Sequence, residues 1–174
     1  MDFSFPAFYN YPPSFTLQPV PSSRQKQLAL WQDLILRFCA QRKVFVIADG
    51  SDFPLFSNAS IDRRMSRELR RAVLEHLASS GVGQWLDPEH RRLLVLWRSP
   101  SAWADEIDAW ARAAGLEGSV VSFEELLGGD EVVGASFEGM PRPLLKESLA
   151  ILEKKGRARM FKGGDGDDVG VKFQ

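Results

Sequence analysis

The sequence predicts an α+β fold of two similar units in tandem, preceded by an extended arm rich in proline and aromatic residues. Apolar residues recur at helical spacing in several segments, short β-rich runs separate these segments, and a set of landmarks recurs 75 positions later. The chain has 174 residues, of which 44% are hydrophobic and 26% charged. This composition is that of a globular protein with one medium core or two small ones.

Residues 1–21 form the predicted arm, which shows neither a helical nor a strand period. Because proline fixes φ and removes a donor, the arm favours polyproline geometry and cannot bury its own rings. We expect these rings to dock on a partner subunit; packing on the chain's own helices and plain disorder are the alternatives. The residues assigned to this docking are Tyr11, Pro12, Pro13, Phe15 and Leu17. On this interpretation, Phe15→Ala weakens assembly without unfolding the domains.

Residues 22–98 form the first predicted unit. Ser22 and Gln25 have the spacing of a capping box, and a helix with an apolar face follows them. A short strand is expected over 44–48, then a second helix that ends at Gly81, a residue suited to a left-handed cap. Apolar runs around Trp85 and Trp97 flank a polar turn and predict a β-hairpin.

Residues 99–174 repeat this order of elements. Ser99 and Pro100 predict an N-cap and a first helical residue, and Ser122 with Glu125 predicts a second capping box after a short strand. A helix is expected from the prolines at 141 and 143 to Gly156. A final hairpin is expected around a turn at 163–168, which lacks the pattern of a phosphate or calcium loop.

One offset of 75 positions relates the two halves. It pairs landmarks in the second helix of each unit: Leu69 with Leu144, Leu74 with Leu149, Leu77 with Leu152, and Gly81 with Gly156. The order helix, strand, helix and hairpin is typical of a winged helix. We therefore predict two tandem winged-helix domains behind the arm.

Composition argues against several classes of function. The net charge is -1, so no overall field attracts DNA or an anionic membrane. A single cysteine, Cys39, suits a reducing compartment, and no apolar run is long enough to span a bilayer, so we expect a cytoplasmic protein. The two histidines, His76 and His90, are not spaced for catalysis or metal binding. We predict a protein that is not an enzyme and needs neither a metal nor another cofactor.

A cluster of arginines is the strongest signal outside the predicted cores. It occupies the start of the second helix of the first unit: Arg63, Arg64, Arg67, Arg70 and Arg71. Taken alone, it favours phosphate contacts, and a DNA-binding tandem winged-helix transcription regulator is the alternative function. Acidic residues lie nearby, so a solvated face and a patch for protein or acidic lipid also remain open.

The chain resembles one family almost from end to end. The segments that carry the likeness are Pro12-Pro13-Ser14-Phe15-Thr16-Leu17-Gln18-Pro19, Arg24-Gln25-Lys26-Gln27-Leu28-Ala29 with Trp31, Pro54-Leu55-Phe56 with Asn58, Trp85-Leu86-Asp87, Trp97-Arg98 with Pro100 and Trp103, Phe137 with Gly139, and Gly170-Val171-Lys172-Phe173. In this order they resemble the vacuolar protein sorting-associated protein 25 family, the smallest subunit of ESCRT-II.

The resemblance implies a non-catalytic subunit of ESCRT-II in endosomal, or multivesicular body, sorting of ubiquitinated membrane cargo. It implies that the arm and first domain dock on the two larger ESCRT-II subunits, with Pro12, Pro13 and Phe15 in the partner pocket. It also implies that the second domain recruits an ESCRT-III subunit on endosomal membranes. The outer side of the last helix, with Arg142 and Lys146, is the face expected to make this second contact.

Overall fold

The chain forms two compact units, Met1–Trp97 and Arg98–Gln174, in a computed structural model that describes residues 2–164 and 168–174. Each unit packs helices against a three-stranded antiparallel sheet. The division falls one residue before the expected boundary, and residues 1–21 belong to the first unit. The middle of the expected turn at 163–168 lies outside the described residues.

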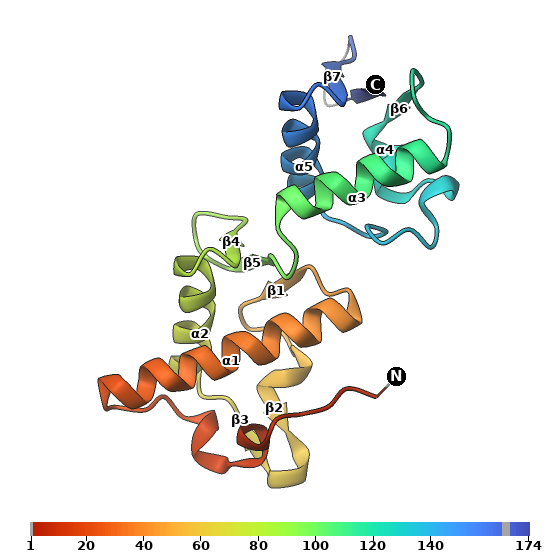
Figure 1. Cartoon of the computed structure of the whole chain (residues 1–174). Coiled ribbons are helices and arrows are strands. Elements are labelled where there is room, and N and C mark those ends of the chain that lie inside the picture. Colours follow the sequence, from red (N-terminus) through yellow and green to blue (C-terminus); the bar gives the residue numbers. More distant parts are fainter. Residues whose placement is uncertain (1, 165–167) are drawn as a thin grey trace. The chain divides into compact units, whose positions relative to one another are not determined.

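The first unit contains two α-helices and two small sheets (Figure 1). Its main sheet has the strand order β1-β5-β4, and a separate two-stranded sheet pairs β2 with β3. The elements are α1 (Pro21–Arg42), β1 (Val46–Ala48), β2 (Ser57–Asn58), β3 (Arg63–Arg64), α2 (Arg67–Ser79), β4 (Gly83–Trp85) and β5 (Arg92–Val95). The hairpin β4–β5 that follows α2 is the wing of this unit.

The second unit repeats this plan with a sheet of order β6-β8-β7. Its elements are α3 (Pro100–Ala113), β6 (Val120–Ser122), α4 (Phe123–Gly128), α5 (Arg142–Lys154), β7 (Ala158–Lys162) and β8 (Val169–Phe173). The hairpin β7–β8 after α5 is the second wing. The mixed helix and sheet composition in this order agrees with the predicted tandem winged helices.

Local signals in the sequence account for most of the helix ends. The Ser99 side chain accepts a hydrogen bond from the amide of Ala102, and Ser122 forms the predicted capping box with Glu125. Gly81 and Gly156 both have positive φ after their helices, as predicted. The capping box predicted at Ser22 is wrong: α1 begins at Pro21 after Val20, with no side-chain cap, because proline at the first position presets the helical φ.

The repeated leucines form the inner faces of α2 and α5. All of the leucines paired by the offset of 75 positions are buried: Leu69, Leu74, Leu77, Leu144, Leu149 and Leu152. Each helix follows a helical period, so these positions fall on one stripe that faces the core of its unit. The sequence repeat therefore reflects the same packing of a leucine-rich helix in both units.

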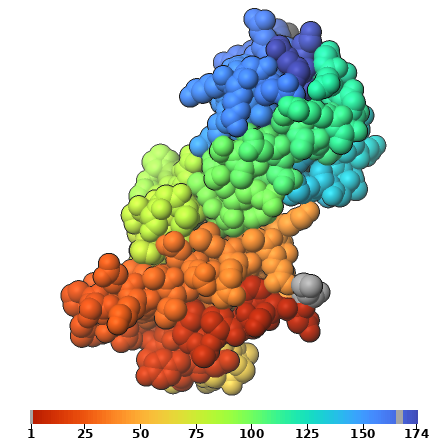
Figure 2. All heavy atoms as spheres, viewed as in Figure 1, coloured from red at the N-terminus to blue at the C-terminus, as the bar shows by residue number. Residues whose placement is uncertain are grey.

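The arm is folded rather than extended, and its own unit buries some of its aromatic rings. It forms two 3-10 turns, η1 (Ala7–Asn10) and η2 (Pro12–Phe15), which lie against α1 and the β2–β3 sheet (Figure 1). The Phe15 side chain is 1% exposed and packs edge-on against the Trp31 ring, with 5.3 Å between ring centroids. The arm and α1 present one continuous surface (Figure 2). The expectation that the arm cannot bury its rings within the chain is wrong for Phe15 and Tyr9, because both rings pack against Trp31 of α1.

Hydrogen bonds fix the backbone of the arm at several points. The indole of Trp31 donates to the carbonyl of Ser14 at 3.0 Å, and the amide of Ser66 donates to the carbonyl of Phe15 at 2.9 Å. Asn58 donates to the carbonyl of Tyr9 at 2.8 Å. Since buried carbonyls are costly to leave without a donor, these bonds select one conformation of the arm.

Candidate docking surfaces

The outer face of the arm forms the first candidate surface. Tyr11 is 61% exposed, and Leu30, on the adjacent face of α1, is 48% exposed. Between them lies a hollow of about 290 Å³, which we call the arm hollow; it is lined by Phe8, Tyr11, Pro13, Ser14, Gln18, Ser23, Lys26, Gln27 and Leu30. Exposed apolar groups beside a preformed hollow are typical of a protein-binding site.

The structure places the predicted arm residues in two different environments. Tyr11 and Pro13 are exposed, and Pro12 is partly buried. Phe15 lies in the core, and Leu17 packs on the edge of that core. Phe15 therefore holds the arm in position, whereas the Tyr11 and Pro13 side chains lie exposed on its outer face.

The arginine cluster divides in the same way. Arg63 and Arg64, in β3, and Arg67, at the start of α2, are exposed. Arg70 and Arg71 pair with the Asp49 carboxylate at 3.4 and 3.2 Å. Two of the five arginines thus share an ion pair with one aspartate distant in sequence, which the linear pattern did not reveal.

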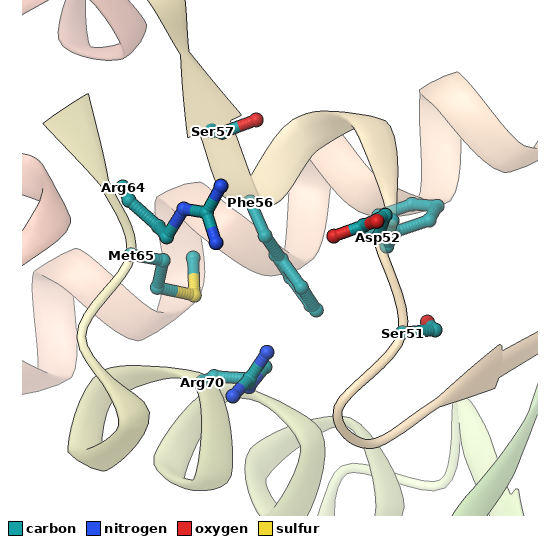
Figure 3. A pocket seen from close by; sticks show the side chains of 8 residues that line it. Ser51, Asp52, Phe56, Ser57, Arg64, Met65 and Arg70 are labelled. Carbon is teal, nitrogen blue, oxygen red and sulfur yellow. The ribbon is translucent and has the colours of Figure 1, made fainter. Parts of the chain in front are cut away.

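A small hollow lies between β3 and the start of α2. Arg64 and Arg70 extend toward Phe56 from these two elements (Figure 3). The hollow has a volume of about 30 Å³, and Asp52 lines it opposite the arginines. That volume admits little more than a water molecule.

The wing of the first unit is tied to α2 by a network of charged and aromatic side chains. We call this the hairpin network; its members are Asp49, Arg71, Glu75, Trp85 and His90. The rings of Trp85 and His90 stack 4.5 Å apart, and Nδ1 of His90 lies 3.0 Å from a carboxylate oxygen of Glu75. The hydrogen bond from His90 lowers the pKa of Glu75, with a smaller contribution from Arg71. His90 thus links the wing to α2.

The second candidate surface is an open groove in the second unit, between α5 and its wing. It has a volume of about 450 Å³ and we call it the α5 groove; its lining is Phe123, Arg142, Lys146, Met160, Phe161, Lys162 and Val169. Phe161 is 40% exposed there. Arg142 and Lys146, predicted as the contact face of this unit, both line the groove.

Arg142 is held in place at the edge of the groove. Its guanidinium pairs with Glu124 at 3.0 Å and lies 5.4 Å from the centre of the Phe123 ring. Lys146, one turn further along α5, is exposed and meets no carboxylate among the residues that the structure describes. The groove thus has an apolar floor and a basic edge.

The described residues offer little for catalysis or metal binding. Among them, no three His, Cys, Asp or Glu side chains gather in a group that could hold a metal ion. Burial raises the pKa of the Cys39 thiol to about 12, so this cysteine is protonated and shielded at neutral pH. Within residues 2–164 and 168–174, no helix has both the length and the apolar character to span a membrane.

Comparisons with known proteins place the chain among one group of relatives. A model of the ESCRT-II complex subunit family matches residues 8–141. The vacuolar protein sorting-associated proteins 25 of Arabidopsis thaliana and Homo sapiens are 46% and 35% identical to the chain. Each alignment covers 99% of this chain, with 96% of the plant protein and 98% of the human one.

Solved structures of proteins with similar names also match the chain. The crystal structure of subunit VPS25 of ESCRT-II matches with a TM-score of 0.83 and 27% identity, over 97% of this chain and 98% of that one. A chain in the structure of the ESCRT-II endosomal trafficking complex matches with a TM-score of 0.79 and 30% identity, over 94% and 97% of the two chains. The chain therefore belongs to the ESCRT-II subunit family of vacuolar protein sorting-associated protein 25.

Proposed function

We propose that this chain is a non-catalytic ESCRT-II subunit that joins the two larger subunits of that complex to an ESCRT-III subunit. It works in the endosomal, multivesicular body sorting of ubiquitinated membrane cargo, as a cytoplasmic protein recruited peripherally to endosomal membranes. One solved ESCRT-II complex contains a similar chain together with VPS22 and VPS36, which supports equivalent partners here. The first unit and its arm bind the larger subunits, and the second unit binds ESCRT-III.

The single observation that carries this proposal is the fixed conformation of the arm. Its backbone is hydrogen-bonded to Trp31, Asn58 and Ser66, so the arm hollow exists before any partner arrives. A surface that is already ordered loses less conformational entropy on binding than a flexible arm would. The exposed ring of Tyr11 beside such a hollow is suited to be an anchor of the interface.

The arm residues then have distinct roles. Tyr11, Pro12 and Pro13 make the contact, and Leu30 extends the same apolar surface onto α1. Phe15 and Leu17 act from inside by holding the arm on its own unit. The Phe15 ring therefore does not enter a pocket of the partner. It supports, from below, the surface that the partner contacts.

Assembly with the larger subunits tests the proposal directly. A chain with both Tyr11→Ala and Leu30→Glu loses an exposed ring and gains a charge in the apolar surface, and we expect it to co-purify poorly with the two larger ESCRT-II subunits. Ala40→Glu is the matched control, because Ala40 is exposed on α1 outside the lining of the arm hollow. Both variants should keep the circular dichroism of the parent. Undiminished co-purification of the double variant would show that the arm hollow is not the contact.

The second unit supplies the contact to ESCRT-III through the outer side of α5, with Arg142 and Lys146. The support is the α5 groove, an apolar surface of a size suited to a partner segment. A pull-down of purified ESCRT-III subunits on the isolated chain tests this part. Absence of any interaction would remove ESCRT-III recruitment from the proposed function and leave assembly with ESCRT-II untouched.

A further inference from the structure

The arginine cluster contains a sequence pattern that the proposed function leaves unused. Arg63 and Arg64 stand three and two positions before Ser66, and no other serine or threonine of the sequence has arginine at both of these positions. Serine/threonine protein kinases with acidic substrate grooves select this pattern, because each guanidinium pairs with carboxylates of the kinase. The pattern therefore marks the Ser66 hydroxyl as an acceptor for a phosphoryl group.

The two arginines of this pattern are accessible to another protein. Arg63 and Arg64 are exposed in β3, where they line an open hollow of about 320 Å³ on the two-stranded sheet. In the part of the chain that the structure describes, the carboxylates that pair with the arginine cluster bind Arg70 and Arg71. The positive charges of Arg63 and Arg64 are therefore available to the carboxylates of a kinase.

The backbone before the Ser66 hydroxyl has the form that a kinase groove requires. Arg63–Arg64 is a strand, and Ser66 has φ -62° and ψ 152°, so this segment is already extended, as kinase substrates are when bound. Met65 is 5% exposed and anchors the segment to the core of the first unit. Two residue pairs join β3 to β2, and so small a sheet opens locally at low cost. Access to Ser66 thus requires the opening of β3 and the first turn of α2, while the rest of the unit stays folded.

The surroundings of Ser66 also favour a phosphate once it has formed. Arg64 and Arg70, which precede and follow Ser66, line the same small hollow (Figure 3). Ser66 is the N-cap of α2, and its Oγ accepts a hydrogen bond from the amide of Leu69 at 3.1 Å. Glu68 is the acidic residue of this first turn, and the arginines around it outnumber it. A phosphate opposite several arginines forms charge-assisted hydrogen bonds that order its segment.

We propose that Ser66 is a phosphorylation site for an arginine-directed serine/threonine protein kinase, which Arg63 and Arg64 recruit, and that the phosphate then pairs with the arginine cluster. In the transfer, Oγ of Ser66 attacks the γ-phosphorus of kinase-bound ATP. The Oγ–P bond forms as the bond from this phosphorus to the β,γ-bridging oxygen breaks, ADP leaves with the electron pair, and the hydroxyl proton passes to the catalytic aspartate of the kinase. The inference goes beyond the proposed function, since it involves neither the larger ESCRT-II subunits nor ESCRT-III.

The test uses the full chain, ATP and the catalytic subunit of cAMP-dependent protein kinase, which selects arginines at these two positions. Incorporation of phosphate is followed with time, and its position is read by tandem mass spectrometry. Ser66→Asn removes the hydroxyl and keeps a residue suited to cap α2. The double variant Arg63→Ala and Arg64→Ala removes the recognition pattern. The double variant Arg91→Ala and Arg92→Ala, at exposed positions of the wing, is the control with the same loss of charge.

We expect the parent chain to take up phosphate on Ser66 and Ser66→Asn to take up none. Loss of Arg63 and Arg64 should slow incorporation by about a hundredfold, about tenfold for each charge-assisted contact, and the wing control should react at the parent rate. In the phosphorylated chain, a ³¹P titration should place the second pKa of the phosphate below its value of about 6 in a flexible peptide, because the arginines favour the dianion. Arg67→Ala should move this pKa back toward the peptide value.

Several results would overturn the inference. One is phosphate on another serine in place of Ser66, above all on Ser101, which has Arg98 three positions before it. Another is an equal rate for the parent and the variant without Arg63 and Arg64. A third is phosphorylation of a peptide of residues 60–70 without phosphorylation of the full chain, because the fold would then shield the hydroxyl. Each of these results leaves the proposed function intact, because co-purification with the larger subunits is measured on chains without phosphate.

Discussion

The two units use the same backbone plan and treat the space between helix and wing in opposite ways. In the first unit the hairpin network fills this space with Asp49, Arg71, Glu75, Trp85 and His90. In the second unit the corresponding space is the α5 groove. The comparison teaches that the winged helix fixes where such a space lies, while a few side chains decide whether it is closed or available.

The charges of the hairpin network lie near the surface, which explains how such a difference can arise. Its ion pairs are between about a third and a half exposed, and pairs of this kind each contribute about 0–1 kcal/mol to stability. The leucine stripes of α2 and α5, in contrast, are fully buried. Loss of such a pair therefore costs the fold little.

The largest expected effect comes from the arm, which covers α1 in the first unit only. Phe15→Ala removes a buried ring from contact with Trp31 and should lower the free energy of unfolding of the first unit by about 3–5 kcal/mol. Unit-resolved hydrogen exchange measures this and should show the second unit unchanged. Tyr11→Ala, at an exposed position, should stay within about 0.5 kcal/mol of the parent. A Phe15 variant as stable as the parent would mean that the arm does not belong to the core.

Opening the hairpin network has a smaller effect. Asp49→Ala removes the shared partner of Arg70 and Arg71 and should destabilise the first unit by about 1 kcal/mol, since the ion pairs are partly exposed. Chemical denaturation measures the change. Asp105→Ala, which removes a more exposed ion pair with Lys155 in the second unit, is the comparison and should change stability less. If Asp49→Ala and Asp105→Ala lowered the free energy of unfolding equally, the hairpin network would stabilise its unit no more than an ordinary surface ion pair does.

Closing the groove of the second unit tests the comparison from the other side. Ala150→Glu places a carboxylate one turn after Lys146, as Glu75 follows Arg71, and should pair with the lysine and weaken the binding of an ESCRT-III subunit by about threefold. Ala150→Gln adds similar bulk without charge and is the control. If both variants weakened the binding of the ESCRT-III subunit equally, steric bulk rather than charge would explain the loss.

The smallest effect concerns pH. The pKa of Glu75 is lowered in the folded chain, so the ionised carboxylate stabilises the first unit above its ordinary pKa of 4.5. That contribution is lost as the pH falls through the lower folded value. The difference in unfolding free energy between the parent and Glu75→Gln should therefore be present at neutral pH and shrink below pH 4.5. A difference that persisted unchanged in acid would show that ionisation of Glu75 is not its source.

Much of the fold was readable from local signals. The helical spacing of leucines, the glycines with positive φ and the capping box at Ser122 predicted the repeated plan, because each of these signals acts within a few residues. The identity of the family also agrees with the resemblance noted in the sequence, and it removes the support for a DNA-binding transcription regulator.

The candidate surfaces were less predictable because they depend on contacts between distant residues. The arm lacks a period of its own, and the Phe15 ring packs against Trp31 of α1, a contact that the arm sequence does not encode. Asp49 forms ion pairs with Arg70 and Arg71, which follow it by more than twenty positions. The α5 groove lies where the first unit has its hairpin network, and this difference becomes visible only when the two units are compared.

Hydrogen–deuterium exchange of the chain, alone and in complex with the two larger ESCRT-II subunits, tests the central claim most directly. If the first unit docks through the arm hollow and the second unit remains available, protection should increase at η1, η2 and the first turns of α1. Exchange in α5 and β7 should stay the same. Protection that increased along the α5 groove while the arm was unaffected would contradict the account.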